Sequence, residues 1–244
     1  MSRHPTLAER YLAEVVGTFL LTFVGGGAAA SAAILAANTK TPVTMPVVLG
    51  VALAHGLILF VIVATLGKVS GAHVNPSVTI GLASAGKFPW TDAIGYIVGQ
   101  FIGATIGAFA ILIVLGVEGA KVGALGAPSL APGVGLLQGL GAEALGAFIL
   151  SFAVNGTAAD SRTPAGWASL AIGLALASAI IFIGPVTGAA VNPARAFGPM
   201  FADIFYGARF DWAAYLVCYL IGPIIGGVAA ANLYAYIARP PCAK

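Results

Sequence analysis

The 244-residue chain is 59% hydrophobic and only 8% charged, with a formal net charge of +3. A soluble domain carries about 25% charged residues, so this chain has too few charges to cover a water-facing surface. The small net charge and the lack of a basic tract also argue against a nucleic-acid partner. The composition therefore predicts an integral membrane protein, with the lipid bilayer as its surroundings.

Six long apolar segments follow one another along the chain. Each is close to the roughly 20 residues that a helix needs to cross a bilayer. We expect helices because a lone apolar strand would leave its backbone polar groups unpaired in lipid. The predicted spans cover residues 10–36, 46–66, 93–117, 137–157, 167–185 and 212–238.

Two shorter stretches, residues 75–86 and 192–203, each begin at an Asn-Pro pair. Proline is favoured in the first turn of a helix, where its missing N–H would be unpaired in any case. Both stretches are too short to cross a membrane. We therefore expect two re-entrant half-helices that end near mid-membrane, where irregular backbone is tolerated only inside protein or along a watery cavity.

The Asn-Pro phrases belong to a longer internal repeat. Residues 70–77 resemble residues 187–194, and further matches pair residues 13–23 with 142–152 and 100–107 with 219–226. Each half, about 8–117 and 137–238, thus has three spans and one half-helix. Because three crossings is an odd number, the second half must enter the membrane inverted, as in many channels and transporters. The predicted fold is all-α, a single membrane channel domain built from an inverted repeat.

Basic residues predict the orientation of this fold, because cytoplasmic loops carry an excess of lysine and arginine. With both termini inside, one side collects Arg3, Arg10, Lys68, Lys87, Arg162, Arg239 and Lys244. The opposite side keeps Lys40, Lys121 and Arg209. The imbalance favours cytoplasmic termini.

The two half-helices are predicted to meet with their N-termini facing each other. Each helix start carries an effective charge of about +0.5, so such a meeting point repels cations. Asparagine side chains add NH2 donors there. Water can accept these hydrogen bonds, and its own hydrogens then point away, which disfavours a proton wire. The predicted pore midplane consists of Asn75, Pro76, Ser77, Asn192, Pro193 and Ala194.

On these motifs the chain resembles the major intrinsic protein family, the aquaporins and aquaglyceroporins, over nearly its whole length. The resemblance rests on the six spans, both half-helices, residues 70–73 before Asn75, and Asn-Pro-Ala-Arg at 192–195. It implies a homotetramer with one pore per subunit. Ser77 departs from the alanine usual in the family; its hydroxyl should lie near the midplane or bond its own helix.

The resemblance also implies an outer selectivity filter, which falls at His55, Ile180, Ala189 and Arg195. Arg195 is permanently charged and would repel cations. This set is similar to the filter of tonoplast-type intrinsic proteins. Glycerol facilitators usually have two filter aromatics and an aspartate after the motif arginine, where this chain has Ala196.

Three more residues take roles from the resemblance. Glu14 and Glu143 occupy equivalent places in the repeat, and the family implies that they accept hydrogen bonds from the re-entrant loops. Solvated positions near helix ends are the alternative for both carboxylates, because burying an unpaired charge is costly. His73 is expected to fix the geometry of its loop.

The predicted function is passive conduction of water with exclusion of protons and ions, in the plasma membrane of a microbe or, second, an organelle membrane; small neutral solutes such as ammonia, hydrogen peroxide or urea are candidate further permeants. The alternatives are a glycerol facilitator, an ion-coupled secondary transporter and an adhesive junction protein without transport. No phosphate loop, metal-ligand spacing or nucleophile–base set occurs in the sequence, so we expect neither an enzyme nor a cofactor.

Overall fold

The computed structural model describes residues 4–164 and 166–239, so Arg3 and Lys244 lie outside the described residues. The first rod joins α1 (Leu7–Leu21), the π-helical turn η1 (Thr22–Gly26) and α2 (Gly27–Thr39). Four long helices follow: α3 (Met45–Ser70), α5 (Trp90–Lys121), α6 (Leu136–Thr157) and α7 (Trp167–Thr187). The last rod joins α9 (Trp212–Ala214), the π-helical segment η4 (Tyr215–Ile221) and α10 (Gly222–Ile237). The half-helices are α4 (Pro76–Ser84) and α8 (Pro193–Asp203), and two 3-10 turns, η2 (Ala124–Gly126) and η3 (Ile204–Tyr206), complete the chain.

The six predicted spans are confirmed among the described residues: six helical rods are long and apolar enough to cross a membrane. Several extend past their predicted bounds. The third runs over Trp90–Lys121 where 93–117 was predicted. Its extra turns carry polar residues such as Asp92 and Lys121, which belong at the water interface and which an apolar pattern does not include.

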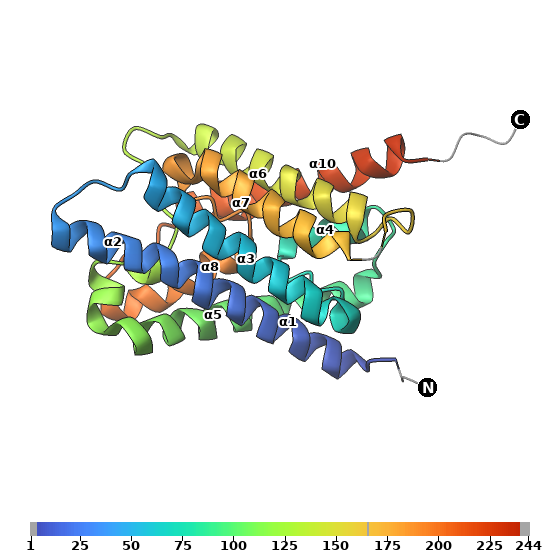
Figure 1. Ribbon diagram of the computed structural model, residues 1–244, viewed down its shortest axis with the longest axis horizontal. Coiled ribbons are helices and arrows are strands. Elements are labelled where there is room, and N and C mark those ends of the chain that lie inside the picture. The colour runs from blue at the N-terminus through green and yellow to red at the C-terminus, as the bar shows by residue number, and fades with distance from the viewer. Residues whose placement is uncertain (1–3, 165, 240–244) are drawn as a thin grey trace, which may run out of the picture.

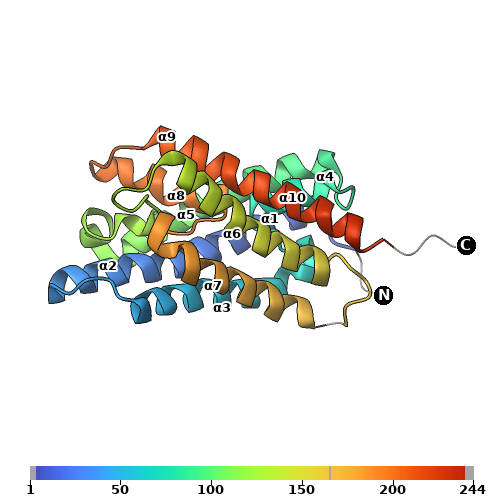
Figure 2. The same ribbon diagram turned by 90° about the horizontal axis from the view of Figure 1, so that it is seen from above.

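The rods run side by side along the long axis of the molecule, and α4 and α8 lie between them (Figures 1 and 2). The described chain starts and finishes at the same end of this bundle, which we call the terminal end. Helix α1 packs on α5 as α6 packs on α10, and α3 packs on α7. The pairing follows the sequence repeat, because the first and third spans of each half are neighbours.

Glycines allow the closest of these helix contacts. A Cβ atom added at Gly107 of α5 would lie 2.8 Å from the carbonyl oxygen of Phe19 in α1. One added at Gly222 of α10 would lie 3.0 Å from the carbonyl oxygen of Leu140 in α6. Small residues at such crossings let backbones approach, which is how helices associate in membranes without a hydrophobic driving force.

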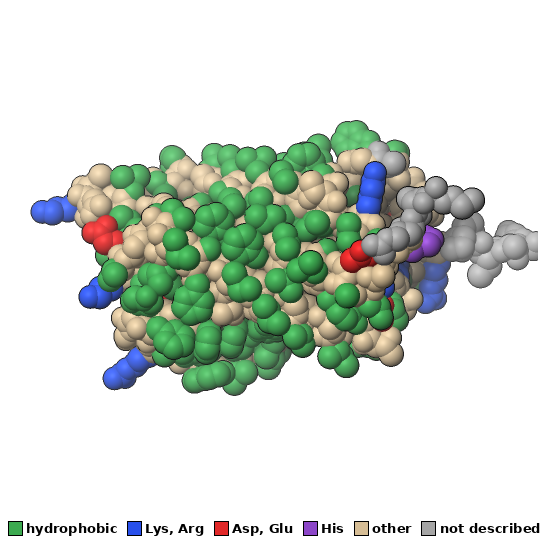
Figure 3. Space-filling view, turned by 90° about the horizontal axis from the view of Figure 1, so that it is seen from below, with side chains coloured by type: hydrophobic (Ala, Val, Ile, Leu, Met, Phe, Trp, Pro, Cys, Tyr) green, Lys and Arg blue, Asp and Glu red, His purple; other side chains and the backbone are tan. Residues whose placement is uncertain are grey.

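The outer surface of the bundle is apolar. Large side chains such as Ile113, Leu137 and Phe182 are 83%, 82% and 73% exposed. Figure 3 shows one face whose middle is mostly hydrophobic, while lysine, arginine and acidic side chains gather at its two ends. A surface of this kind suits the hydrocarbon core of a bilayer, with its charged ends in the headgroup regions.

Two kinds of helix irregularity were not predicted. The π-helical segments η1 and η4 interrupt the first and last rods. Helix α5 is also broken at Gly116, whose φ of 64° lies in the left-handed region. Such π-bulges occur frequently at functional sites, and η1 lies beside the pore described next.

Candidate functional site

The first half-helix is built by its own sequence. Asn75 is its N-cap in an extended conformation, and Pro76 follows at the first helical position, where proline fits best. The Asn75 Oδ1 atom accepts hydrogen bonds from the backbone N–H and the hydroxyl of Ser77, both at 2.9 Å. Both hydrogen bonds to the Asn75 side-chain oxygen therefore come from Ser77, the position at which the family usually has alanine.

The second half-helix repeats this arrangement with a different pair of donors. Asn192 caps α8, and Pro193 follows it. The Oδ1 atom of Asn192 accepts from the backbone N–H groups of Ala194 and Arg195 at 3.0 and 3.1 Å. The Oδ1 atoms of both asparagines thus accept hydrogen bonds within their own half-helices, so their NH2 groups are available for partners outside those helices.

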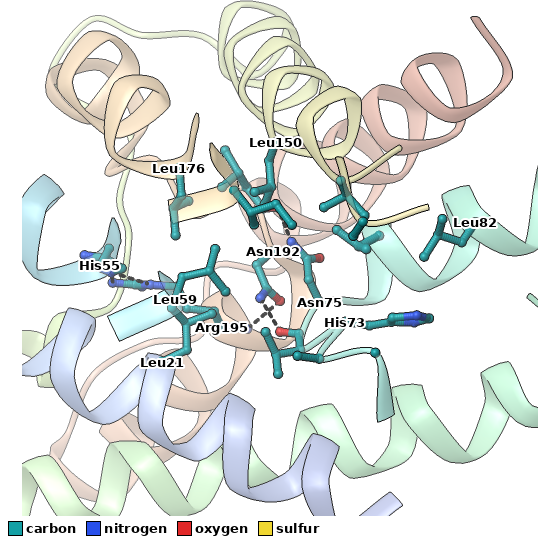
Figure 4. Close-up of a pocket in the computed structure, with 18 of the residues that line it drawn as sticks. Leu21, His55, Leu59, His73, Asn75, Leu82, Leu150, Leu176, Asn192 and Arg195 are labelled. Atoms are coloured by element: carbon teal, nitrogen blue, oxygen red, sulfur yellow. Dashed lines mark hydrogen bonds between the residues drawn. The ribbon is translucent and has the colours of Figure 1, made fainter. Parts of the chain in front are cut away.

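The NH2 groups connect the two halves of the chain. The Nδ2 of Asn75 donates to the carbonyl of Val191 at 2.9 Å, and the Nδ2 of Asn192 donates to the carbonyl of Val74 at 2.8 Å. Figure 4 shows the two asparagines beside each other at the middle of the pocket. Each NH2 carries two hydrogens, so one remains for a molecule in the cavity. The half-helix N-termini therefore meet, as the sequence predicts, and their positive dipole ends converge.

The loops that carry the asparagines are strained at matching places. Val74 and Val191 both have φ = 44°, a left-handed conformation unusual for β-branched residues. Residues in such regions cost about 1–3 kcal/mol each and persist when their surroundings over-determine them. These two valines supply the carbonyls that the asparagines bind, so the strained backbone is what turns those oxygens toward the midplane.

Glu14 holds the first loop. It is fully buried, and its carboxylate accepts from the backbone N–H groups of His73 and Val74 at 3.0 and 2.6 Å. The Ser70 hydroxyl donates at 2.7 Å and the Gln100 amide at 2.8 Å. This carboxylate therefore binds the loop on one side and the α5 helix on the other.

Glu143 holds the second loop in the same way. It is also fully buried, and it accepts from the N–H groups of Ala190 and Val191 at 2.9 and 2.6 Å. The Thr187 hydroxyl donates to it at 2.6 Å. Neither glutamate is at a solvated helix end, so that alternative from the sequence is wrong.

His73 lies in the first loop and contacts the half-helix. Its Nδ1 is 3.2 Å from the Thr79 hydroxyl, which itself donates to the Asn75 carbonyl at 3.1 Å. Because the hydroxyl hydrogen is used, the ring nitrogen must be the donor. The ring also packs against Phe88 and Tyr96, with centroids 4.6 and 5.0 Å away. His73 thus ties its loop to α4 and α5.

A cavity of about 220 Å³ lies around the asparagines and is lined by residues of both halves of the chain. Figure 4 shows His55 on one side of the asparagines and His73 and Leu82 on the other. Lys87 and Ala159, which follow α4 and α6, also line the cavity. Its wall between these points is largely leucine, valine and isoleucine. A largely apolar cavity with polar side chains at its middle and on both sides of it, among them His55 and Lys87, is suited to small uncharged molecules.

His55 and Arg195 form one hydrogen-bonded unit. The Nε and one terminal nitrogen of Arg195 donate to His55 Nε2 at 3.3 and 3.2 Å, and a second terminal nitrogen donates to the Gly126 carbonyl at 2.8 Å. The His55 Nδ1 is 2.9 Å from the carbonyl of Val51. Since Nε2 accepts, the ring is neutral with its proton on Nδ1. The pair places one fixed positive charge at this end of the cavity.

The other two predicted filter residues lie in an apolar cluster. Ile180 and Ala189 are 3% and 1% exposed and pack with residues such as Leu176 and Ile183. The lining of the described cavity includes His55 and Arg195 but neither Ile180 nor Ala189. The structure thus brings two of the four predicted filter side chains into contact, and the other two remain predictions.

At the terminal end, Lys87 stands beside a surface network. Its Nζ lies 5.2 Å from the centre of the Tyr234 ring, and the Tyr234 hydroxyl donates to Asp160 at 2.7 Å. Asp160 also pairs with Arg162. Hydrogen bonds from Arg162 and then Tyr234 hold the pKa of the Asp160 carboxyl below its ordinary value. This network fixes the loop between α6 and α7 near the mouth of the cavity.

Three residues at the site were missed by sequence reasoning. Gln100 is a polar residue inside an apolar span, and that contrast was a usable signal. Gly126 binds Arg195 through its carbonyl, which no sequence motif reveals. Gly25, in the Gly25–Gly27 run of η1 and α2, lies against the His55 ring. Within residues 4–164 and 166–239, no group of three or more His, Cys, Asp or Glu side chains could hold a metal ion.

Six membrane-length rods, two capped half-helices and a lined cavity define a multi-pass membrane protein of the channel type. The comparisons agree: the family described as "Major intrinsic protein" matches residues 1–234, and the chain belongs to that family, whose members are channels and not enzymes. The "Probable aquaporin AqpM" of Archaeoglobus fulgidus is 43% identical over 244 residues, covering 96% of this chain and 98% of that protein. "Aquaporin NIP1-1" of Zea mays is 34% identical over 229 residues, covering 94% and 74%.

A solved structure shares the fold as well. The aquaglyceroporin from Plasmodium falciparum superposes with a TM-score of 0.83 at 25% identity, covering 96% of this chain and 98% of the other. The predicted fold class of six spans and two half-helices in an inverted repeat is therefore confirmed.

Proposed function

We propose that this protein is a passive channel for water that also admits small neutral solutes and excludes protons and other ions. One observation carries the proposal: Asn75 and Asn192 each bind the carbonyl beside the other, at the meeting point of two half-helix N-termini inside the cavity. The kinship with proteins named as aquaporins supports it.

The mechanism follows from the hydrogens that the asparagines leave free. A water molecule at the midplane accepts from both NH2 groups through its oxygen, so its hydrogens point toward the two ends of the pore. A chain of waters oriented outward from this point cannot pass a proton along in one direction. The converging helix dipoles and Arg195 add a positive potential that repels cations.

Osmotic shrinkage of reconstituted vesicles, followed by stopped-flow light scattering, tests this function. We expect vesicles that contain the protein to shrink much faster than bare lipid under a sucrose gradient. Shrinkage at the bare-lipid rate would contradict the proposal and would favour a junction protein without transport. Flux that follows an ion gradient or the membrane potential would favour a coupled transporter.

The filter determines which solutes accompany water. With His55, Ile180, Ala189 and Arg195, we propose a tonoplast-like filter that is wider and less polar than one with a second histidine at the Ile180 position. Ammonia, hydrogen peroxide and urea should permeate. Separate stopped-flow runs with each solute check this, and a pore that passes water alone would show that the filter assignment is wrong.

Glycerol is the second candidate solute, because the similar solved structure is an aquaglyceroporin. Two features of this chain argue against a dedicated glycerol pathway: Ala189 provides no aromatic wall, and Ala196 follows the arginine. Re-swelling of vesicles in glycerol decides between the two. Re-swelling as fast as with water-sized solutes would establish a glycerol facilitator.

We also propose a homotetramer with one pore per subunit in the plasma membrane of a microbe, with both termini cytoplasmic. The apolar outer surface and the basic residues at the terminal end, among them Arg10, Lys68 and Lys87, support this placement. Native mass spectrometry from detergent tests the subunit count, and protease accessibility of the termini in intact cells tests the orientation.

A further inference from the structure

We propose that Gly25 is a specificity-determining residue of the pore, because its missing side chain leaves the seat in which the His55 ring lies. The inference rests on the proposed channel function and extends it to a residue behind the pore wall. Gly25 belongs to the π-helical turn η1 and is buried. Leu21, one turn earlier on the same rod, lines the cavity, so Gly25 lies on the helix face that looks toward the pore.

The fit between Gly25 and His55 leaves no room for a methyl group. A Cβ atom at Gly25 would lie 2.5 Å from His55 Nε2 and 2.6 Å from Cγ, and it would also meet Cδ2. Real Cβ atoms essentially never approach other atoms this closely, so the whole ring would have to move. The tip of a flexible side chain could rotate away from such a contact. Here the contact involves three atoms along one edge of the His55 ring, including Cγ, the ring atom nearest the backbone.

The hydrogen bonds of His55 decide where a displaced ring can go. Nδ1 donates to Val51 in its own helix, and Nε2 accepts from Arg195. Moving the ring away from Gly25 breaks or stretches these bonds and drives the imidazole toward the cavity it lines. A larger residue at position 25 therefore both narrows the pore and removes the acceptor that orients Arg195.

The second half of the chain offers a natural comparison. By the repeat register that pairs Glu14 with Glu143, Gly25 corresponds to Val154; by the register that pairs the asparagines, His55 corresponds to Ile172. Val154 and Ile172 both line the cavity toward the terminal end. In the second half, a valine takes the place of Gly25 and an isoleucine takes the place of His55. The small residue thus goes with the polar, bulky filter residue.

The same π-helical turn also supports the arginine. Gly26 packs directly against Gly126, whose φ of 76° is left-handed and whose carbonyl accepts from Arg195 at 2.8 Å. A Cβ atom at Gly126 would overlap the backbone of Gly26. Residues 25 and 26 of one turn therefore stand behind both members of the His55–Arg195 pair. This gives the π-bulge a role that packing of the first rod alone does not explain.

The experiment compares Gly25→Ala, His55→Ala and the double variant with the wild-type protein in vesicles, using osmotic water permeability and the ratio of urea to water permeability. Gly27→Ala is the matched control, since a Cβ there would meet only Ile111 at an ordinary 3.7 Å. We expect Gly25→Ala to lower water permeability by about tenfold or more through overpacking. In the His55→Ala background, the same substitution should change both quantities less than about twofold, because the ring that it displaces is gone.

Equal effects of Gly25→Ala with and without the His55 ring would overturn the proposal, as would wild-type permeability and selectivity in the single variant. Should Gly25→Ala fail to reconstitute, recovery of folded, conducting protein in the double variant would still support the seat, and failure of both would contradict it. A wild-type protein that conducts no water would instead sink the proposed function, so the two failures are distinguishable.

Discussion

The two halves of this chain agree at the middle of the membrane and differ at the ends of the pore. Asn75 and Asn192 have the same cap, the same proline and reciprocal carbonyl partners. Three residues beyond each asparagine, however, the first half has Val78 and the second has Arg195. Both side chains line the same cavity at opposite ends.

The comparison separates two requirements that the repeat combines. Bringing two half-helices together needs matched caps, matched strained loops and a carboxylate behind each, so those features occur twice. Discriminating among solutes needs one constriction only. The His55–Arg195 pair is accordingly present at one end, while its counterparts in the repeat, Ile172 and Val78, are apolar.

The braces are the shared feature whose removal should have the largest effect. Glu143→Ala leaves the N–H groups of Ala190 and Val191 and the Thr187 hydroxyl without their acceptor. A buried unsatisfied donor costs about 1–3 kcal/mol, so three together should lower the melting temperature in detergent strongly and abolish water permeability. Thermal unfolding followed by circular dichroism, with Glu143→Gln as the size-matched control, measures this.

Glu14→Ala should be at least as severe, because Glu14 also accepts from Gln100 of α5. If each carboxylate holds only the loop of its own half, either single variant leaves the loop of the other half intact. Wild-type melting and permeability in either alanine variant would show that the carboxylates are not what holds the strained loops.

Arg195→Val makes the second half resemble the first and should have the next largest effect. Loss of the fixed charge and of its bonds to His55 and Gly126 removes the discrimination at that end, while the midplane stays intact. We expect water permeability to persist and urea and cation permeability to rise several-fold. Parallel stopped-flow and ion-flux assays check this; unchanged selectivity would move the filter elsewhere.

His55→Ile extends the comparison, since isoleucine is the counterpart at position 172. Arg195 keeps its charge and its bond to the Gly126 carbonyl but loses its acceptor on the opposite wall. We expect a smaller rise in urea permeability than in Arg195→Val, together with retained exclusion of cations. Cation permeability as high as that of Arg195→Val would mean that the Arg195 charge excludes cations only when the His55 ring is present.

Ser77→Ala gives the first motif the alanine of the second and should have the smallest effect. It removes one hydrogen bond to Asn75 Oδ1, worth about 1 kcal/mol, but keeps the backbone N–H that makes the same contact. Because only one modest hydrogen bond is lost, water permeability should stay within about twofold of the wild-type value. A large loss of permeability would show that the hydroxyl is needed to orient the asparagine.

Much of this architecture could be predicted from the sequence because lipid imposes simple rules. Spans show as apolar runs, and half-helices show as short runs after Asn-Pro, since their caps are local. The meeting of the two half-helix N-termini follows from the repeat together with its inversion, whereas the bonds from Asn75 and Asn192 to the carbonyls of the opposite loops were seen only in the structure. Glu14 and Glu143 could be placed only through family resemblance, because nothing local distinguishes a brace from a solvated helix end.

The parts that could not be predicted depend on contacts distant in sequence. No sequence rule predicts the η1 π-bulge. The backbone hydrogen-bond pattern of the first rod shifts where Gly25 contacts His55 and Gly26 contacts Gly126, and both partners come from other segments of the chain. The role of the Gly126 carbonyl arises from a short 3-10 turn that happens to end beside Arg195. Apolar positions such as Ile180 and Ala189 are equally at home in a core or on a pore wall, so the sequence does not separate the two.

The most direct test of the central claim measures water and proton flux on the same vesicles. Shrinkage under a sucrose shock is recorded by light scattering, and proton entry under an imposed potential is recorded by a trapped pH-sensitive dye. We predict that wild-type vesicles shrink far faster than bare lipid while proton entry stays at the bare-lipid level. Proton entry that rises together with water flux, or shrinkage no faster than bare lipid, would contradict a midplane where two helix ends and two asparagines orient the water.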